Sequence, residues 1–278
     1  MNELSGSQWL YWTNTIFETN FPPDPTHLHR KSHGAMKPPE LMAEIISFFS
    51  KPGEVILDPF AGVGGTLLGA ELVDREALGI EINPLWVNIY EEMTRMFVKE
   101  DGSFVKISGN NPQPGQRLNS KMILGDCLEV LKNLADGSMA AIITDPPYGC
   151  QNTGIAFKKE TNFHMKSNNE KDFGNCPSYH DYLQKMKLFG AEAYRILIPG
   201  RYLVMLVGDR FYRGEYLPLG VLVALALREV GFKWKGLRIW WNKATQRPLK
   251  PYAVKSCFVP NINHQNLLIL RKETKNNC

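Results

Sequence analysis

Short runs of aliphatic residues alternate with segments of helical periodicity along most of this 278-residue chain. Residues 36–50 place Leu41, Ile45 and Phe49 on one helical face, and a short apolar strand at 55–57 follows. Strands that alternate with helices are typical of a largely parallel sheet covered on both faces. We expect seven strands, at residues 55–57, 77–80, 122–124, 140–143, 202–207, 237–241 and 267–270. The sequence therefore predicts a doubly wound α/β fold with a mostly parallel seven-stranded sheet.

The rest of the chain is interpreted as additions to one domain that spans residues 1–278. Residues 1–34 are rich in Trp and Pro and predict an extended N-terminal wrap. Residues 150–180 are polar and too long for an ordinary connection, so we expect an inserted loop that is either functional or disordered. Residues 233–263 form a basic region with interleaved aromatic residues.

The net charge is only +4, but it is unevenly distributed. From Phe232 to Cys278 there are ten Lys or Arg and one acid, a charge of +9, whereas the remainder has 22 basic and 27 acidic residues, or −5. Such asymmetry indicates an end that faces a polyanion, although a solvated basic tail would give the same count. The aromatic and proline residues between the charges favour a shaped nucleic-acid groove over a loose tail.

Five scattered cysteines, none in a CxxC pair, suggest neither a zinc site nor a disulfide framework. No apolar stretch is long enough to cross a bilayer, and the first residues lack the basic-then-apolar pattern of a signal peptide. We therefore expect a cytoplasmic protein without a metal or a membrane partner. The sequence leaves open whether it is a monomer or a homodimer.

A glycine-rich turn directly after the first strand marks the expected ligand site. Ligands of parallel sheets bind beyond the carboxyl ends of the strands, where Asp58-Pro-Phe-Ala-Gly-Val-Gly-Gly65 stands. No Lys follows the glycines as a phosphate-binding P-loop requires, and Leu67 replaces the third glycine of the dinucleotide motif GxGxxG. A nucleoside without a phosphate remains, because a short glycine turn lets the backbone approach such a ligand closely.

The next three strands also end in acidic turns, which contain Glu81, Asp126 and Asp145. Glu81 is placed to accept hydrogen bonds from ribose hydroxyls, and Asp126 to receive an adenine amino group. The fourth turn, Asp145-Pro-Pro-Tyr148, would by itself be an ordinary end of a strand. Four acidic turns along one sheet edge are harder to explain as strand endings, so we expect them to form one site.

Together these segments resemble the amino-methyltransferases that use S-adenosylmethionine to modify exocyclic nitrogens of DNA bases. The resemblance covers residues 33–272 and includes the glycine turn, the segment His33-Gly-Ala-Met-Lys-Pro38 and the tetrapeptide Asp145-Pro-Pro-Tyr148. It implies the Rossmann-like methyltransferase fold and S-adenosylmethionine as cofactor. The cofactor contacts that it implies are His33, Lys37, Pro38, Asp58, Pro59, Phe60, Gly62, Gly64, Thr66, Glu81 and Asp126.

The resemblance also assigns catalysis to Asp145, Pro146, Pro147 and Tyr148. An aromatic amine is a poor nucleophile because its lone pair is delocalised into the ring. The Asp145 carboxylate and the Pro146 carbonyl would accept its N–H bonds and draw the nitrogen toward tetrahedral geometry, while Tyr148 stacks on the base. The base must first flip out of the duplex, because its amino group is paired inside the helix.

We expect duplex DNA as the partner and adenine N6 as the target, as in enzymes of restriction–modification systems. Cytosine N4 needs the same amine chemistry and is one alternative; guanine N2 in transfer RNA is another, since those enzymes also contain Asp-Pro-Pro-Tyr. The cofactor turn precedes the catalytic tetrapeptide here, which is a permuted order relative to many relatives. The expected nucleic-acid contacts are Lys158, Lys159, Arg238, Lys243, Arg247, Lys250 and Lys255.

Overall fold

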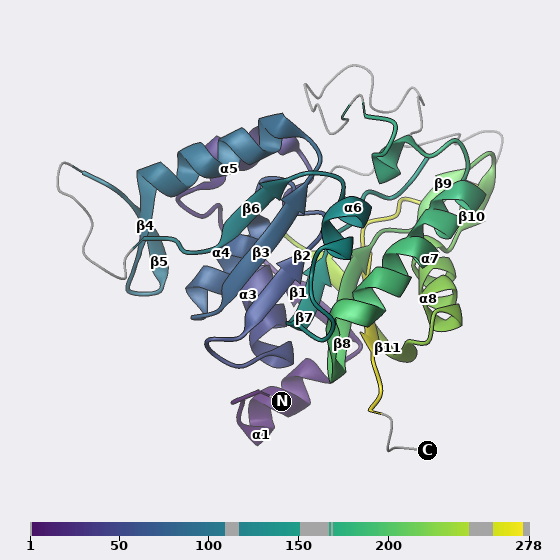
Figure 1. Cartoon of the computed structure of the whole chain (residues 1–278), viewed down its shortest axis with the longest axis horizontal. Helices are drawn as coiled ribbons and strands as arrows, with labels where there is room; N and C mark the ends of the chain where they lie inside the picture. Colours follow the sequence, from purple (N-terminus) through teal and green to yellow (C-terminus); the bar gives the residue numbers. More distant parts are fainter. Residues whose placement is uncertain (1, 109–116, 151–166, 168, 245–257, 275–278) are drawn as a thin grey trace.

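The computed structural model describes residues 2–108, 117–150, 167, 169–244 and 258–274, and its centre is an eight-stranded sheet (Figure 1). The strands lie in the order β1-β11-β12-β8-β7-β2-β3-β6. β12 runs antiparallel to both neighbours, whereas the other adjacent pairs are parallel. This arrangement confirms the predicted doubly wound, mostly parallel α/β fold. The sheet strands are β1 (Ile16–Thr19), β2 (Val55–Asp58), β3 (Glu76–Glu81), β6 (Lys121–Leu124), β7 (Met139–Thr144), β8 (Leu197–Val207), β11 (Lys233–Asn242) and β12 (Gln265–Arg271).

The seven predicted strands are all present, and the eighth comes from the segment predicted as an extended wrap. That segment contains α1 (Gly6–Trp12), β1, α2 (His27–Arg30) and the short 3₁₀ helix η1 (Lys31–His33). β1 pairs in parallel with β11 and buries Phe17 and Thr19, whereas Ile16 and Glu18 are exposed. Buried and exposed residues alternate over only these four positions, and such a short alternation is not recognisable in the sequence beside the flanking Trp and Pro residues.

Helices cover both faces of the sheet (Figure 1). One face is covered by α3 (Pro39–Phe49), α4 (Gly65–Leu72) and α5 (Pro84–Met96), and the other by α6 (Cys127–Lys132), α7 (Tyr179–Ile196) and α8 (Leu219–Glu229). In β7, Ile142 belongs to the core under α6–α8, whereas Ala141 and Ile143 belong to the core under α3–α5. A strand covered on both faces has no solvent-facing side, which explains why β7 is apolar almost throughout.

Two small hairpins lie at opposite ends of the molecule (Figure 1) and were not predicted from the sequence. β4 (Phe97–Glu100) and β5 (Ser103–Lys106) follow α5, and β9 (Arg210–Tyr212) and β10 (Glu215–Leu217) follow β8. Because β8 runs parallel to β7, the hairpin β9–β10 begins at the carboxyl edge of the parallel strands. This edge is where the sequence predicts the ligand site.

Candidate active site

The four acidic turns lie along one edge of the sheet. β2, β3, β6 and β7 are parallel, so their carboxyl ends share an edge. Asp58 ends β2 and Glu81 ends β3, whereas Asp126 and Asp145 follow β6 and β7 closely. The chain order reverses between β2 and β7, and such a switch point is where open parallel sheets bind ligands.

Asp58 stabilises the glycine turn from inside the fold, and it is only 2% exposed. One carboxylate oxygen accepts hydrogen bonds from Thr144 Oγ1 (2.5 Å) and the Phe60 N–H (3.1 Å), and the other accepts from Thr66 Oγ1 (2.5 Å). Burial raises the pKa of Asp58 to about 6, although these hydrogen bonds oppose the shift. Asp58 and Thr66 are both expected as cofactor contacts, but they are hydrogen-bonded to each other. Through Thr66 and Thr144, Asp58 connects β2 to α4 and to β7.

His33 lies against the glycine turn. Gly62 has a φ of +51°, and a Cβ at this position would lie 3.1 Å from His33 Nε2, so a side chain here would be both strained and crowded. The His33 ring also packs edge-on against Trp86, with 4.9 Å between ring centroids. Burial, followed by the charges of Lys37 and Arg30, lowers the pKa of His33 to about 4, so the ring is neutral near pH 7. His33 Nδ1 is buried without a hydrogen-bond partner among the described residues.

The Glu81 side chain is hydrogen-bonded to the backbone of the same glycine turn. Its two carboxylate oxygens accept hydrogen bonds from the Gly62 N–H and the Asn83 N–H, both at 2.8 Å. Burial raises the pKa of Glu81 to about 7; the two backbone hydrogen bonds oppose this shift, and the nearby Asp172 and Asp58 add to it. Each oxygen keeps further acceptor capacity, so the carboxylate can still bind hydroxyl donors.

Asp126 is the N-cap of α6, and one of its carboxylate oxygens accepts from the Leu128 N–H at 3.1 Å. Its other oxygen lies 3.9 Å from Lys171 Nζ. Lys171 belongs to the described end of the predicted inserted loop, where Phe173, in the short 3₁₀ helix η3 (Phe173–Asn175), packs edge-on against Phe60 at 4.9 Å. This part of the loop therefore lies on the glycine turn and Asp126. Lys158 and Lys159, from the same loop, are outside the described residues.

Asp145, the first residue after β7, contacts two donors. Tyr148 OH donates to Asp145 Oδ1 at 2.7 Å, and Lys37 Nζ forms an ion pair with Asp145 Oδ2. The Tyr148 hydroxyl accepts in turn from Gln265 Nε2 at 2.5 Å. Burial and the neighbouring Asp145 raise the pKa of Tyr148, so its hydroxyl stays protonated. Pro146 is buried beside Asp145, whose side chain is 19% exposed.

Lys37 reaches Asp145 from the stretch just before α3, where Pro38 is the N-cap. The Lys37 carbonyl accepts from Arg30 Nη1 at 3.4 Å, and Arg30 is a fully buried residue that pairs with Asp24 at 2.6 Å. The buried pair thus fixes the backbone next to Lys37. The sequence predicts Lys37 as a cofactor contact, and the structure places its ammonium group on the predicted catalytic carboxylate.

The prediction that Arg238 contacts nucleic acid is wrong. Arg238 is 3% exposed, its guanidinium lies 4.2 Å from the ring centroids of Trp12 and Phe17, and its Nε donates to the Asn14 carbonyl at 2.6 Å. The N-terminal segment buries this residue of β11, and the charge count could not reveal that contact. Lys243 is 44% exposed and forms an ion pair with Glu18. Arg247, Lys250 and Lys255 lie outside the described residues.

Two features of this edge were missed in the sequence. Gln265 begins β12, and because β12 is antiparallel, its first residue lies where β7 and β8 end. The available signal was a polar residue at the start of an apolar strand. Arg210 and Arg213 lie on the hairpin β9–β10, whose exposed turn contains Gly214 with a φ of +88°. That glycine was the available signal for the hairpin.

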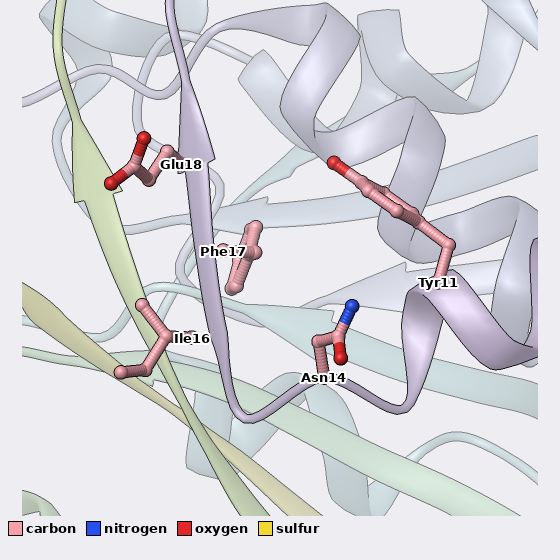
Figure 2. A pocket seen from close by; sticks show the side chains of 5 residues that line it. All are labelled: Tyr11, Asn14, Ile16, Phe17 and Glu18. Carbon is pink, nitrogen blue, oxygen red and sulfur yellow. The ribbon is translucent and has the colours of Figure 1, made fainter.

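A shallow hollow of about 290 Å³ lies elsewhere, beside α1 and β1 (Figure 2). Because β1 is parallel to the strands of the site, its start lies at the sheet edge opposite Asp145. The carboxylate in its lining, Glu18, pairs with Lys243, so the hollow presents no catalytic arrangement. The residues that line the hollow are Tyr11, Asn14, Ile16, Phe17 and Glu18.

Across the described part of the chain, no cluster of three His, Cys, Asp or Glu could hold a metal, and no helix could span a bilayer.

The fold is that of the Rossmann-like methyltransferases. The crystal structure of TrmN from Thermus thermophilus matches 89% of this chain and 53% of its own, with a TM-score of 0.54 and 13% identity. At that identity the match shows the shared fold. The fold and the acidic edge together define a doubly wound α/β protein with a candidate ligand site at the carboxyl ends of its parallel strands.

The sequence matches the DNA methylase family over residues 2–92 and 139–277, and the chain belongs to this family. The Type II methyltransferase M.HinfI of Haemophilus influenzae is 30% identical over 113 residues, which are 41% of this chain and 31% of that protein. The tRNA (guanine(10)-N2)-dimethyltransferase of Methanocaldococcus jannaschii is 30% identical over 138 residues, 48% of this chain and 33% of that protein. The chain thus spans about a third of the length of these curated relatives. The family predicted from the motifs is confirmed.

Proposed function

We propose that this chain transfers a methyl group from S-adenosylmethionine to the exocyclic N6 of adenine in duplex DNA. The main support is the Asp145 carboxylate, which Lys37 and Tyr148 contact beside Pro146 at the edge that also holds Glu81. Membership of the DNA methylase family supports the substrate class. In the amino-methyltransferases that the chain resembles, Ser in place of Asp145 would favour cytosine N4, so the Asp supports adenine.

The residues at this edge fit S-adenosylmethionine. Glu81 keeps acceptor capacity for ribose hydroxyls, and the Asp126 carboxylate lies farther along the same edge for an adenine amino group. His33 Nδ1 is buried without a hydrogen-bond partner in the described part of the chain, and Nε2 of the same ring lies against Gly62. The glycine turn has no phosphate-binding Lys, which suits a cofactor without phosphates. When bound, S-adenosylmethionine supplies a methyl group on a positively charged sulfur.

Asp145 and Pro146 provide the acceptors that an aromatic amine needs. Each Asp145 oxygen has one donor among the described residues and can accept a second hydrogen bond, and the Pro146 ring restricts the backbone that carries its own carbonyl. An amine whose N–H bonds are accepted here gains tetrahedral character, so its lone pair becomes available for attack. The amine releases a proton after it is methylated, so no general base is required beforehand.

The target base has to leave the duplex before it can reach Asp145. Arg210 and Arg213 on the hairpin β9–β10 and Lys243 at the end of β11 are described cations on elements that reach this edge. We infer that these residues contact the phosphate backbone, since such contacts orient a protein on nucleic acid without reading its sequence. The similarity to M.HinfI, a Type II methyltransferase, supports a DNA-modifying role of the restriction–modification kind.

Two other targets are alternatives. Cytosine N4 presents the same kind of amine to Asp145. Guanine N2 in transfer RNA is supported by the 30% identity to a tRNA (guanine(10)-N2)-dimethyltransferase. The alternatives differ in product, so the methylated nucleoside identifies the target.

The test is a transfer assay with isotopically labelled S-adenosylmethionine and three substrates: unmodified duplex DNA, single-stranded DNA and transfer RNA. The nucleic acids are digested, and the labelled nucleoside is identified by mass spectrometry. We expect N6-methyladenine from duplex DNA and no label with Asp145→Ala. N4-methylcytosine would correct the target base, and label in transfer RNA alone would overturn the proposal for DNA.

A further inference from the structure

We propose that Gln265 is a positioning residue for methyl transfer, acting through Tyr148 on Asp145; this inference rests on the proposed function. Gln265 Nε2 donates to the Tyr148 hydroxyl at 2.5 Å, and that hydroxyl donates to Asp145 Oδ1 at 2.7 Å. The three side chains form one hydrogen-bonded relay from the start of β12 to the end of β7. Gln265 therefore helps to direct the Tyr148 hydroxyl toward Asp145.

The strand register explains how Gln265 reaches this position. Asn266 pairs with Val207 across the antiparallel β12 and β8, so the preceding residue of β12 lies next to Gly208. A Cβ at Gly208 would lie 2.8 Å from Tyr148 Cε2, so the tyrosine ring packs directly against the backbone there. Gly208, just after β8, thus contacts the ring of Tyr148 and its hydroxyl, and the start of β12 contacts the hydroxyl through the side chain of Gln265.

The direction of each hydrogen bond follows from the available donors. Asp145 is paired with Lys37, and a carboxylate can only accept hydrogen bonds. The single hydroxyl proton of Tyr148 must therefore point to Asp145, and its oxygen then needs a donor from elsewhere. The Gln265 amide nitrogen supplies one such donor, and the backbone of Gly208 supplies another. Without the Gln265 amide, the hydroxyl proton would be held toward Asp145 less firmly.

Packing alone does not explain an amide at position 265. Gln265 Oε1 is buried and has no hydrogen-bond partner among the described residues. A buried oxygen without a partner lowers stability, and an aliphatic side chain of similar size would fill the space without that penalty. The bond to Tyr148 is therefore the better explanation for the amide.

The experiment compares Gln265→Leu, Gln265→Glu and wild type in single-turnover methyl transfer. Loss of one hydrogen bond in Gln265→Leu should lower the rate constant about tenfold while cofactor affinity changes by less than about twofold. Gln265→Glu has nearly the same shape, but its ionised carboxylate competes with Asp145 for the Tyr148 proton. Its rate should fall further and recover as the pH is lowered, because a protonated Glu can donate to Tyr148. Gln184→Leu, at an exposed position of α7, is the matched control and should keep the wild-type rate.

A wild-type rate constant in Gln265→Leu would overturn the positioning role, as would identical pH profiles for the Leu and Glu variants. A double-mutant cycle tests the relay without any measurement of enzyme activity. The effects of Gln265→Leu and Tyr148→Phe on the free energy of unfolding should be non-additive, whereas additive effects would contradict the relay. If wild type methylates no nucleic acid but the cycle shows coupling, the proposed function fails and the hydrogen-bonded relay stands.

Discussion

Lys37 Nζ and Asp145 Oδ2 form an ion pair that spans 108 positions of sequence. The two side chains are 9% and 19% exposed, so both are shielded from water. The pair links the N-terminal segment, fixed by the buried Arg30 and Asp24, to the turn proposed to hold the target amine. A residue near the start of the chain is therefore part of the proposed catalytic centre.

Lys37→Met should slow methyl transfer by at least about tenfold, because a partly buried Asp145 without its partner will not hold its orientation. Lys37→Arg is the matched control, since it keeps the positive charge and should retain most of the rate. Single-turnover kinetics with saturating cofactor measure the effect. Equal rates for wild type and Lys37→Met would show that the pair has no role in catalysis.

The affinity for S-adenosylmethionine should depend on pH through Glu81. Burial raises the pKa of Glu81 to about 7, so the carboxylate is largely protonated below this value and ionised above it. The ionised form accepts hydroxyl hydrogen bonds at both oxygens, whereas the protonated form has less acceptor capacity. Affinity should therefore weaken as the pH falls from about 8 to about 6.

Isothermal titration calorimetry across this pH range measures the dependence. Glu81→Gln, which does not titrate, should bind more weakly than wild type at high pH and show a flatter profile. A wild-type affinity that stays constant across the range would contradict the role proposed for Glu81.

Arg213→Ala should weaken DNA binding and reduce its dependence on salt. Arg213 is exposed in the turn of the hairpin β9–β10, and removing one cation that binds a phosphate should lower the slope of log affinity against log salt by about one. Fluorescence anisotropy with a labelled duplex at several salt concentrations gives this slope.

Two variants serve as controls for Arg213. Arg95→Ala removes a cation that is 73% exposed near the end of α5, toward the opposite edge of the sheet. Arg238→Met removes the buried guanidinium between Trp12 and Phe17. Both should leave the slope unchanged, and a reduced slope in either would show that the interface is misplaced.

The fold was predictable because its signals are local. The run of apolar residues in β7, followed by Asp145, identifies a doubly covered strand that ends at the candidate site. The glycine turn after β2 identifies the first strand of the sheet in the same way. β1 was missed because its identity depends on pairing with β11, more than 200 positions away, and not on its own four residues.

The roles of several site residues depend on contacts that spacing does not contain. The sequence assigns Asp58 and Lys37 to the cofactor; the structure shows that Asp58 binds two threonine hydroxyls and that Lys37 pairs with Asp145. Gln265 enters the site only because β12 runs antiparallel to β8. Arg238 is a cation in a basic segment, yet the N-terminal segment buries it. Motifs predict which residues form the candidate site, and tertiary contacts determine what each of these residues contacts in the structure.

The most direct measurement compares Asp145→Ala with wild type in methyl transfer and in cofactor binding on the same samples. The Ala variant lacks the acceptor for the target amine but leaves Glu81 and the glycine turn intact. Transfer should fall by about a hundredfold or more, the effect expected when a group that stabilises the transition state is removed. The dissociation constant for S-adenosylmethionine should stay within about twofold of wild type, as expected for a group that acts only on the amine. A near-normal transfer rate in Asp145→Ala would contradict the central role assigned to this carboxylate.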